Sequence, residues 1–352
     1  MSATVTISID AMGGDHAPGM VIEGVRLAHV RLPHVRYLLF GDAARLEPLL
    51  DAAPELKGVC QVRHTEESVS GDAKPSQVLR TGRKSSMWLA VDAVAKGEAA
   101  GIVSAGNTGA LMAVSKFVLR TLPGVDRPAI AGLFPTIRGE TVMLDLGANV
   151  ECSASNLVQF AVMGEVFARH VLGLEQPTIG ILNIGSEELK GNDAVRTAAN
   201  ALRETHLPIR FHGFVEGNDI CAGTVDVVVS DGFTGNIALK TAEGTVKLYS
   251  TCLKQAFQNS LLAKIGYLFA KPALNKVKVR TDPRRYNGAM FLGLNGIAVK
   301  SHGGTDAFGF ANAIGVAVDL VAHGYNDRIR KEMECLKSQE GQGAASLAAS
   351  NG

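Results

Sequence analysis

The sequence predicts an α/β fold: a three-layer α/β/α sandwich on a mostly parallel sheet, with a helical segment that protrudes from it. Hydrophobic residues make up 46% of the 352 residues, aromatic residues only 5%, and glycine occurs 39 times. Short β-branched runs alternate with longer segments of helical periodicity along most of the chain. A Val, Ile, Leu and Ala core with glycine at strand-to-helix turns is typical of parallel sheets covered on both faces.

The elements follow from this alternation. Strands are expected at residues 4–10, 36–41, 101–104, 141–145, 178–183, 210–213 and 225–230. Helices are expected at residues 19–31, 85–96, 109–120, 155–172 and 187–205. Residues 245–280 are apolar, flanked by lysines and without a clear strand, so we expect them to form the helical protrusion. Residues 1–335 show no convincing linker and should form one domain, while residues 336–352 are expected to be a flexible tail.

Composition and missing motifs argue against several functions. The formal charge of +1 does not suit a general nucleic-acid binder. The five cysteines are scattered singly, which argues against a zinc site or a disulfide framework and fits a cytoplasmic protein. We expect neither a signal peptide nor a membrane span. The nucleotide motifs GxGxxG and Walker A, the metal motif HExxH and the nucleophile elbow GxSxG are absent, so we expect no cofactor, no metal and no covalent nucleophile.

Five loops that follow predicted strands have a composition that suits anion binding. They are residues 10–19, 104–110, 145–149, 183–191 and 230–236, and each mixes Gly with Asn, Asp, Ser or Thr. Glycine lets the backbone approach a ligand, and the helix start that follows offers unpaired amides and a partial positive charge. These residues are also common in ordinary turns and N-caps. Because ligands bind at the carboxyl ends of parallel strands, we expect the five loops to gather at one edge of the sheet.

The loop motifs resemble those of the bacterial phosphate acyltransferase family, PlsX. The resemblance rests on IDAMGGDHAP, SAGNTGA, LDLGAN, GILNIGSEELKG, FVEGNDI, VVVSDGFTGNIALK and KSHGG, which are spread from Ile9 to Gly304. It implies a sandwich related to phosphotransacetylases and the isocitrate dehydrogenase-like fold. It also implies transfer of a long-chain fatty acyl group from acyl carrier protein to inorganic phosphate, giving acyl phosphate for phospholipid synthesis. The family forms homodimers that associate peripherally with the inner face of the cell membrane and supply a membrane glycerol-3-phosphate acyltransferase.

This reaction needs no activated protein nucleophile, because phosphate itself attacks the thioester carbonyl. The catalytic candidates are Lys190, Asp231, Asn183 and His16. Lys190 could supply a cation to phosphate or to the oxyanion, or it could be a solvated surface lysine. Asp231 could orient phosphate or accept a proton, or it could be a helix N-cap. His16, like His302, could protonate the leaving thiolate, although a hydrogen-bonded structural histidine is the commoner case.

Phosphate or substrate binding is expected from residues of the same loops. The candidates are Asp10, Gly13, Gly14, Ser104, Asn107, Thr108, Gly109, Asn149, Gly185, Glu187, Thr234, Gly235 and Asn236. Thr234 and Asn236 suit hydrogen bonding to a ligand oxygen, because neither side chain titrates usefully. Ser104, Asn107 and Thr108 could instead be a favourable helix start, and Asp10 could hold its own loop in shape.

The predicted protrusion carries an apolar face that suits an anionic membrane surface. This face consists of Leu261, Leu262, Ile265, Leu268 and Phe269, with lysines beside it. Packing of the same residues against a partner subunit is the alternative, and Pro272 is expected to end or kink the helix.

Other functions remain compatible with the sequence. A phosphotransacetylase-like enzyme could use coenzyme A, a dicarboxylate dehydrogenase could share the fold, and a catalytically silent scaffold could dock acyl carrier protein. Arg80, Arg83 and Lys84 could attract an acidic carrier protein, or they could be an ordinary solvated helix end.

Overall fold

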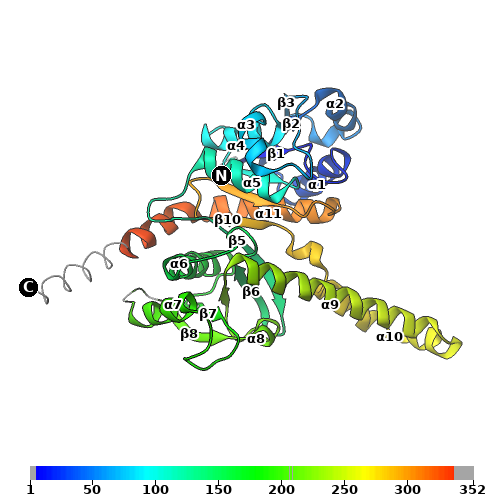
Figure 1. Ribbon diagram of the computed structural model, residues 1–352. Helices are drawn as coiled ribbons and strands as arrows, with labels where there is room; N and C mark the ends of the chain where they lie inside the picture. Colours follow the sequence, from blue (N-terminus) through cyan, green and yellow to red (C-terminus); the bar gives the residue numbers. More distant parts are fainter. Residues whose placement is uncertain (1–4, 206, 208, 337–352) are drawn as a thin grey trace, which may run out of the picture.

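The computed structural model describes residues 5–205, 207 and 209–336, so residues 337–352 of the predicted tail lie outside the described part. Within the described residues one eleven-stranded sheet runs through the molecule, in the order β3-β2-β1-β4-β11-β10-β5-β6-β9-β7-β8 (Figure 1). Helices cover both faces of this sheet, which confirms the predicted three-layer sandwich.

The element bounds agree with the predicted alternation and add to it. The strands are β1 (Val5–Asp10), β2 (Val35–Gly41), β3 (Cys60–His64), β4 (Gly101–Ser104), β5 (Ala129–Thr136), β6 (Gly139–Leu144), β7 (Thr178–Leu182), β8 (Arg210–Val215), β9 (Val227–Val229), β10 (Ala289–Leu292) and β11 (Ile297–Lys300). The helices are α1 (Gly19–Arg31), α2 (Ala43–Asp51), α3 (Pro75–Thr81), α4 (Ser86–Ala95), α5 (Thr108–Leu119), α6 (Ala154–Val171), α7 (Asp193–Glu204), α8 (Gly217–Ala222), α9 (Gly232–Gln258), α10 (Leu261–Arg280) and α11 (Ala307–Ala322). The sequence pattern did not reveal β3, β5, β10 and β11.

The sheet reverses its direction in the middle. β11 pairs antiparallel with β10, β10 with β5, and β5 with β6. The pairs on either side of this central part are parallel. These three successive antiparallel pairings among the described strands mean that β1, β2, β3, β4 and β11 run opposite to β6, β7, β8 and β9.

The expectation that all five loops gather at one edge is therefore wrong. The loops after β1 and β4 lie at one edge of the sheet, and those after β6, β7 and β9 lie at the other. The error arose because the apolar composition of a buried strand does not encode its direction. Because strands twist cumulatively along a sheet, the two halves are nonetheless turned strongly relative to each other.

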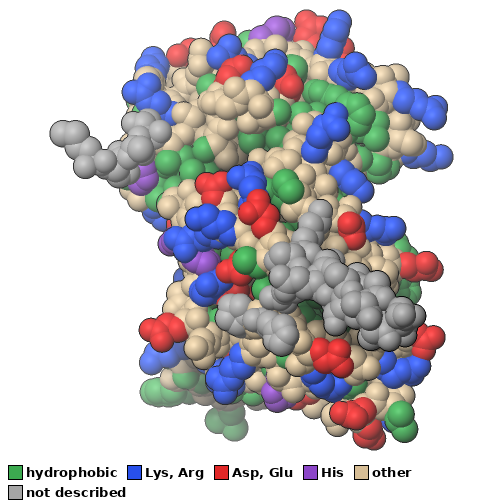
Figure 2. Space-filling view, turned by 90° about the vertical axis from the view of Figure 1, so that its left-hand side faces the viewer, with side chains coloured by type: hydrophobic (Ala, Val, Ile, Leu, Met, Phe, Trp, Pro, Cys, Tyr) green, Lys and Arg blue, Asp and Glu red, His purple; other side chains and the backbone are tan. Residues whose placement is uncertain are grey.

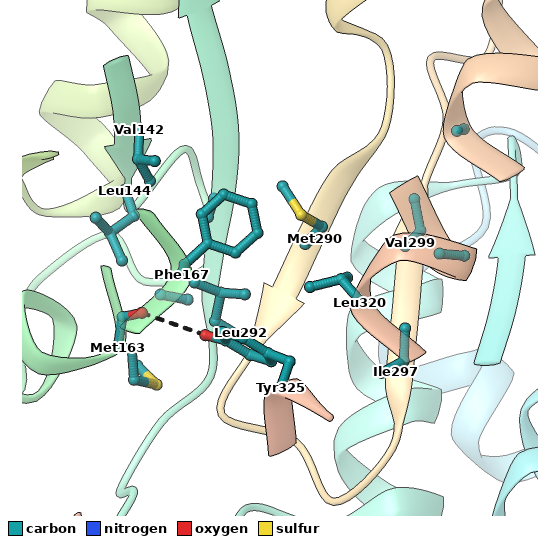
Figure 3. Close-up of a cluster of buried hydrophobic side chains, with 14 of the residues drawn as sticks. Val142, Leu144, Met163, Phe167, Met290, Leu292, Ile297, Val299, Leu320 and Tyr325 are labelled. Carbon is teal, nitrogen blue, oxygen red and sulfur yellow. Dashed lines mark hydrogen bonds between the residues drawn. The ribbon is translucent and has the colours of Figure 1, made fainter. Parts of the chain in front are cut away.

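The two halves share a core on the face covered by α6 and α11. Met290 and Leu292 of β10 lie between Phe167 of α6 and the side chains of β11 (Figure 3). Tyr325, which is 2% exposed, donates its hydroxyl to the carbonyl oxygen of Met163 at 3.3 Å. The rings of Phe167 and Tyr325 meet edge to face, with centroids 5.9 Å apart. The hairpin of β10 and β11, which follows the protrusion in the chain, thus locks the halves together.

The protrusion consists of the outer part of α9 and the whole of α10 (Figure 1). The helix itself begins earlier than residue 245, at Gly232, and it packs Leu239 and Ala242 against the core of the sheet before it protrudes. α10 has no buried residue and continues through Pro272, so the expectation that the helix ends there is wrong. Its last residue, Arg280, donates to the carbonyl oxygens of Thr136 and Ile137 at 2.8 and 2.7 Å, which anchors the protrusion to the end of β5.

Within the described part of the chain, no single helix has the length and apolar character needed to cross a bilayer. The helix pair Ala307–Ala322 and Tyr325–Leu336 reaches that length only when two helices bent by 57° are counted together.

Gly235 allows the first turn of α9 to touch the loop after β6. A Cβ atom at this position would lie 2.6 Å from Ser230 Oγ and would overlap the carbonyl oxygen of Asp145. Neither neighbour is the end of a flexible chain, so the helix itself would have to move. The structure therefore gives this glycine a packing role.

We predict that Gly235→Ala lowers the free energy of unfolding by about 1–3 kcal/mol, the usual range for overpacking. The matched control is Gly244→Ala in the same helix, where an added Cβ would meet nothing within 4 Å. It should leave stability unchanged or raise it by up to about 1 kcal/mol. Urea unfolding of both variants checks this, and equal losses in the two would contradict the packing role.

Candidate active site

The buried carboxylate of Asp10 organises the loops after β1 and β4. Its side chain is 2% exposed and accepts hydrogen bonds from the hydroxyls of Ser86 and Ser104, each at 2.7 Å. Ser104 Oγ in turn accepts the amide of Gly106 at 3.0 Å. Burial raises the pKa of Asp10, and the two serine hydroxyls oppose that rise. A Cβ at Gly13 would lie 2.7 Å from the Gly106 amide, so this glycine allows the loops to meet. Asp10, Gly13 and Ser104 therefore shape this edge.

The start of α5 combines a cap with exposed backbone. Asn107 accepts the amide of Ala110 at 2.8 Å through Oδ1 and donates through Nδ2 to the carbonyl oxygen of Gly71 at 2.7 Å. Its side chain is thus engaged as the N-cap, one of the two roles considered. Thr108 and Gly109 follow it and are exposed. Their amides belong to the first turn, where backbone donors have no partner inside the helix.

Asp145 holds the loop after β6 at the opposite edge. Its carboxylate is fully buried. Oδ1 accepts the amides of Ile130, Gly147 and Ala148 at 2.9, 3.2 and 3.0 Å. Oδ2 accepts both the amide and the side-chain Nδ2 of Asn149, at 2.7 and 2.9 Å. Burial raises the pKa of Asp145, and these hydrogen bonds oppose it. The side chain of Asn149 is therefore engaged in holding this loop.

The loop after β9 joins the same group through Asp231, which caps α9. Asp231 Oδ1 accepts the Thr234 amide at 2.7 Å, and Oδ2 accepts the Thr234 hydroxyl at 3.0 Å. The amide of Gly232 donates to the carbonyl oxygen of Asn149 at 2.7 Å. A Cβ at Gly147 would lie 3.7 Å from Asn236. Asp231, Thr234, Asn236 and Asn149 thus lie together, and Asp231 remains half-buried.

The loop after β7 lies beside this group because β7 pairs with β9. Asn183 shapes the loop: Oδ1 accepts the Ile184 amide at 2.9 Å, and Nδ2 donates to the Lys190 carbonyl oxygen at 3.1 Å. The Lys190 amide donates to the Glu187 carbonyl oxygen at 3.0 Å. The side chains of Glu187 and Lys190 are exposed. Within the described residues Lys190 forms no ion pair, so its ammonium is free to meet a ligand.

The histidine candidates lie at the first edge. His16 is exposed in the loop before α1. His302 accepts the amide of Gly304 at 3.2 Å through Nδ1, which favours its structural role. Gly14 has φ +107°, a conformation that glycine adopts easily, and it lies close to the Gly303 carbonyl oxygen.

Lys300 was not among the residues that the sequence pattern singled out. It ends β11, is 8% exposed, and donates through Nζ to the carbonyl oxygens of Ala105, at 3.3 Å, and Ser301. Burial lowers its pKa to about 8, and the charge of Lys240 on α9 acts in the same direction. The available signal was a lysine at the end of the apolar run Ile297–Val299, since lysine is rarely buried.

Burial disfavours the reactive thiolate form of the two half-buried cysteines, Cys60 and Cys152. Cys152 is the cysteine near Asp145 and Asp231, and burial raises its pKa to about 11. Burial also raises the pKa of Cys60, to about 12. Both are therefore protonated thiols at neutral pH. Among residues 5–205, 207 and 209–336, no three His, Cys, Asp or Glu side chains are grouped so as to hold a metal ion.

The arrangement suits the binding of anions and not covalent catalysis by the protein. One group of candidates, from Asp10 to Gly14 and from Ser104 to Gly109, lies at the first edge. The second group comprises Asn149, Asp231, Thr234, Gly235 and Asn236, with Asn183, Gly185, Glu187 and Lys190 beside it.

Comparison with known proteins places this arrangement in a family. The family model described as "Fatty acid synthesis protein" matches residues 5–328. A phosphate acyltransferase of Paramagnetospirillum magneticum is 81% identical over 340 residues, which cover 97% of either chain. One from Rhodospirillum rubrum is 66% identical over 333 residues, 95% of either chain.

Solved structures share the fold at low identity. A phosphotransacetylase from Streptococcus pyogenes has a TM-score of 0.60 at 16% identity, covering 91% of this chain and 94% of its own. A 4-hydroxythreonine-4-phosphate dehydrogenase from Klebsiella pneumoniae has a TM-score of 0.54 at 15% identity, covering 91% and 98%. These confirm the predicted relation to phosphotransacetylase-like folds. The chain itself belongs to the phosphate acyltransferase family, acyltransferases of fatty acid and phospholipid synthesis that transfer an acyl group to phosphate.

Proposed function

We propose that the acyl donor is a long-chain acyl carrier protein, and that the product acyl phosphate enters phosphatidic acid synthesis. The observation that supports this proposal is that the loop after β9, where α9 begins, lies beside the loops after β6 and β7, with the protonated thiol of Cys152 nearby. Phosphate can be bound there and attack a thioester without a protein nucleophile. Phosphotransacetylase-like use of coenzyme A is the alternative that the shared fold favours.

The roles follow from the reaction. A phosphate oxygen forms a bond to the thioester carbonyl carbon, and the C–S bond then breaks with its electron pair going to sulfur. The proton that hydrogen phosphate loses balances the one that the thiolate gains. Lys190 is proposed to stabilise phosphate or the oxyanion, and Asp231 to orient phosphate while capping α9. His16 is exposed at the other edge and is the less direct candidate for the thiolate.

We predict that Lys190→Ala and Asp231→Asn each raise the activation barrier by roughly 2–4 kcal/mol, the scale of losing one preorganised electrostatic group. Melting temperatures should hardly change, because Lys190 has no ion pair among the described residues and Asn caps helices as well as Asp. The control is Lys57→Ala, which removes an exposed lysine paired with Asp51.

The assay measures acyl phosphate formed from purified protein and phosphate, with acyl carrier protein or coenzyme A as the acyl carrier. Near-normal turnover of either variant would remove its residue from the site. Faster reaction with coenzyme A would favour the alternative donor. Loss of activity in EDTA, with recovery on adding a divalent ion, would contradict the metal-free reaction.

The outer surface of the protrusion is proposed to serve two contacts. Val246, Leu248 and Tyr249 of α9 are 38%, 65% and 64% exposed, an apolar surface that a second copy of the chain could cover in a homodimer. At the tip, Leu261, Leu262, Ile265, Leu268 and Phe269 are 76%, 82%, 46%, 67% and 83% exposed. We propose that this tip touches an anionic membrane peripherally, on the cytoplasmic side, near the glycerol-3-phosphate acyltransferase that takes the product.

The carrier protein is proposed to approach the half of the molecule that contains α3 and α4. Arg80 lies in the last turn of α3, and Arg83 and Lys84 lie between α3 and α4. The guanidinium of Arg83 lies 5.9 Å from the ring centre of Trp88. An acidic partner would be attracted there. On the face opposite the protrusion, acidic and basic side chains are interspersed (Figure 2). That mixture offers no comparable attraction.

We predict that Leu268→Glu and Phe269→Glu abolish flotation with vesicles containing anionic lipid, because a carboxylate at the tip opposes insertion and is repelled by the lipid. Val30→Glu is the matched control, since Val30 is 71% exposed on α1, away from the protrusion. It should float like the wild type. Turnover on soluble substrate and the mass of the assembled protein in solution should be unchanged in all three variants. A broken dimer in the tip variants, or a wild type that does not bind vesicles, would contradict the membrane contact.

A further inference from the structure

Exposed apolar side chains accompany the polar residues of the loops after β6, β7 and β9. Val150, Ile184, Leu189, Phe233 and Ile237 are 69%, 81%, 89%, 60% and 49% exposed. Each is the direct sequence neighbour of a polar residue of the candidate site, in turn Asn149, Asn183, Lys190, Thr234 and Asn236. We call these five apolar residues the apolar rim. Large apolar side chains that are exposed together mark a surface that binds a ligand or a partner.

The three loops that carry the apolar rim leave neighbouring strands. β9 pairs in parallel with β6 on one side and with β7 on the other, so the loops after these strands start side by side. The Gly232 amide donates to the carbonyl oxygen of Asn149 at 2.7 Å, and a Cβ at Gly232 would lie 3.0 Å from the Asn149 nitrogen. Val150 and Phe233 directly follow the two residues of this contact. Phe233 and Ile237 are four residues apart in α9 and therefore lie on the same side of that helix.

The reaction of the family indicates which ligand suits this rim. An acyl group is transferred to phosphate, so the hydrocarbon chain of the substrate begins at the carbonyl carbon that phosphate attacks. Lys190 and Asp231, which are proposed to act on phosphate and the oxyanion, lie in the same loops as the rim. A second copy of the protein seated on the rim would cover these side chains too and close the site to its substrates. A hydrocarbon chain attached to the reacting carbonyl would cover the rim without blocking the site.

We propose that the apolar rim binds the hydrocarbon chain of the acyl donor and determines a preference for long chains. The proposal rests on the proposed reaction at Lys190 and Asp231, and it adds the residues that recognise the chain. Each methylene group that leaves water for an apolar surface favours binding, by roughly fourfold when it is fully buried. The rim covers a chain on one side only, so the gain per methylene group is smaller. It accumulates along a long chain, whereas a short chain gains little.

The experiment compares Phe233→Ser and Ile184→Ser with the wild type. Initial rates are measured with butanoyl and hexadecanoyl thioesters and phosphate, in the absence of lipid. Both side chains are exposed, so their replacement should leave the fold intact. The ratio of kcat/KM for the hexadecanoyl donor to that for the butanoyl donor should fall about tenfold in Phe233→Ser and about threefold in Ile184→Ser, because each variant loses apolar contact with the long chain.

The matched control is Val30→Ser, which replaces a residue that is 71% exposed on α1 and should keep the wild-type ratio. A wild-type ratio in both rim variants would overturn the proposal. If the mass of the assembled protein in solution also fell in them, the rim would be identified as a contact between subunits. Both thioesters are supplied on acyl carrier protein and on coenzyme A. A reaction that takes place only with coenzyme A, and in which the ratio still falls, would contradict the proposed donor and leave the role of the rim intact.

Discussion

The position of the candidate site depends on the buried carboxylate of Asp145. Its two oxygens accept amides from both ends of the turn after β6 and from Ile130 of β5, so they hold that turn against the central strand. The first turn of α9 then packs on this turn so closely that Gly235 has no room for a side chain.

The reversal of the sheet divides the candidate loops into two groups. With β10 and β5 antiparallel to their neighbours, the carboxyl ends of the two parallel halves point to opposite edges. Loops at opposite edges cannot share a ligand by strand order alone. Helix α9 starts at the edge where β6, β7 and β9 end, and its outer length runs away from the sheet as part of the protrusion (Figure 1).

Many of the polar residues in these loops serve to build them. Four of these side chains form hydrogen bonds to the backbone or to neighbouring side chains: Asp10, Asn107, Asn149 and Asn183. The groups that remain for a ligand are the backbone amides of exposed residues at helix starts, such as Thr108 and Gly109, and the exposed side chain of Lys190. This division fits a reaction in which phosphate is the nucleophile, because the protein then contributes binding and charge stabilisation.

The sequence by itself determined the alternation of strands and helices, the family, the polar loops and the apolar face of the protrusion, because each depends on residues close together in the chain. Only the tertiary structure decided the direction of β5 and β10, the early start of α9 and the continuation of α10 through Pro272. It also decided which polar side chains were already engaged and that Lys300 was buried without an ion pair. These depend on contacts between residues far apart in sequence, such as Ala105 with Lys300, and local periodicity carries no information about them.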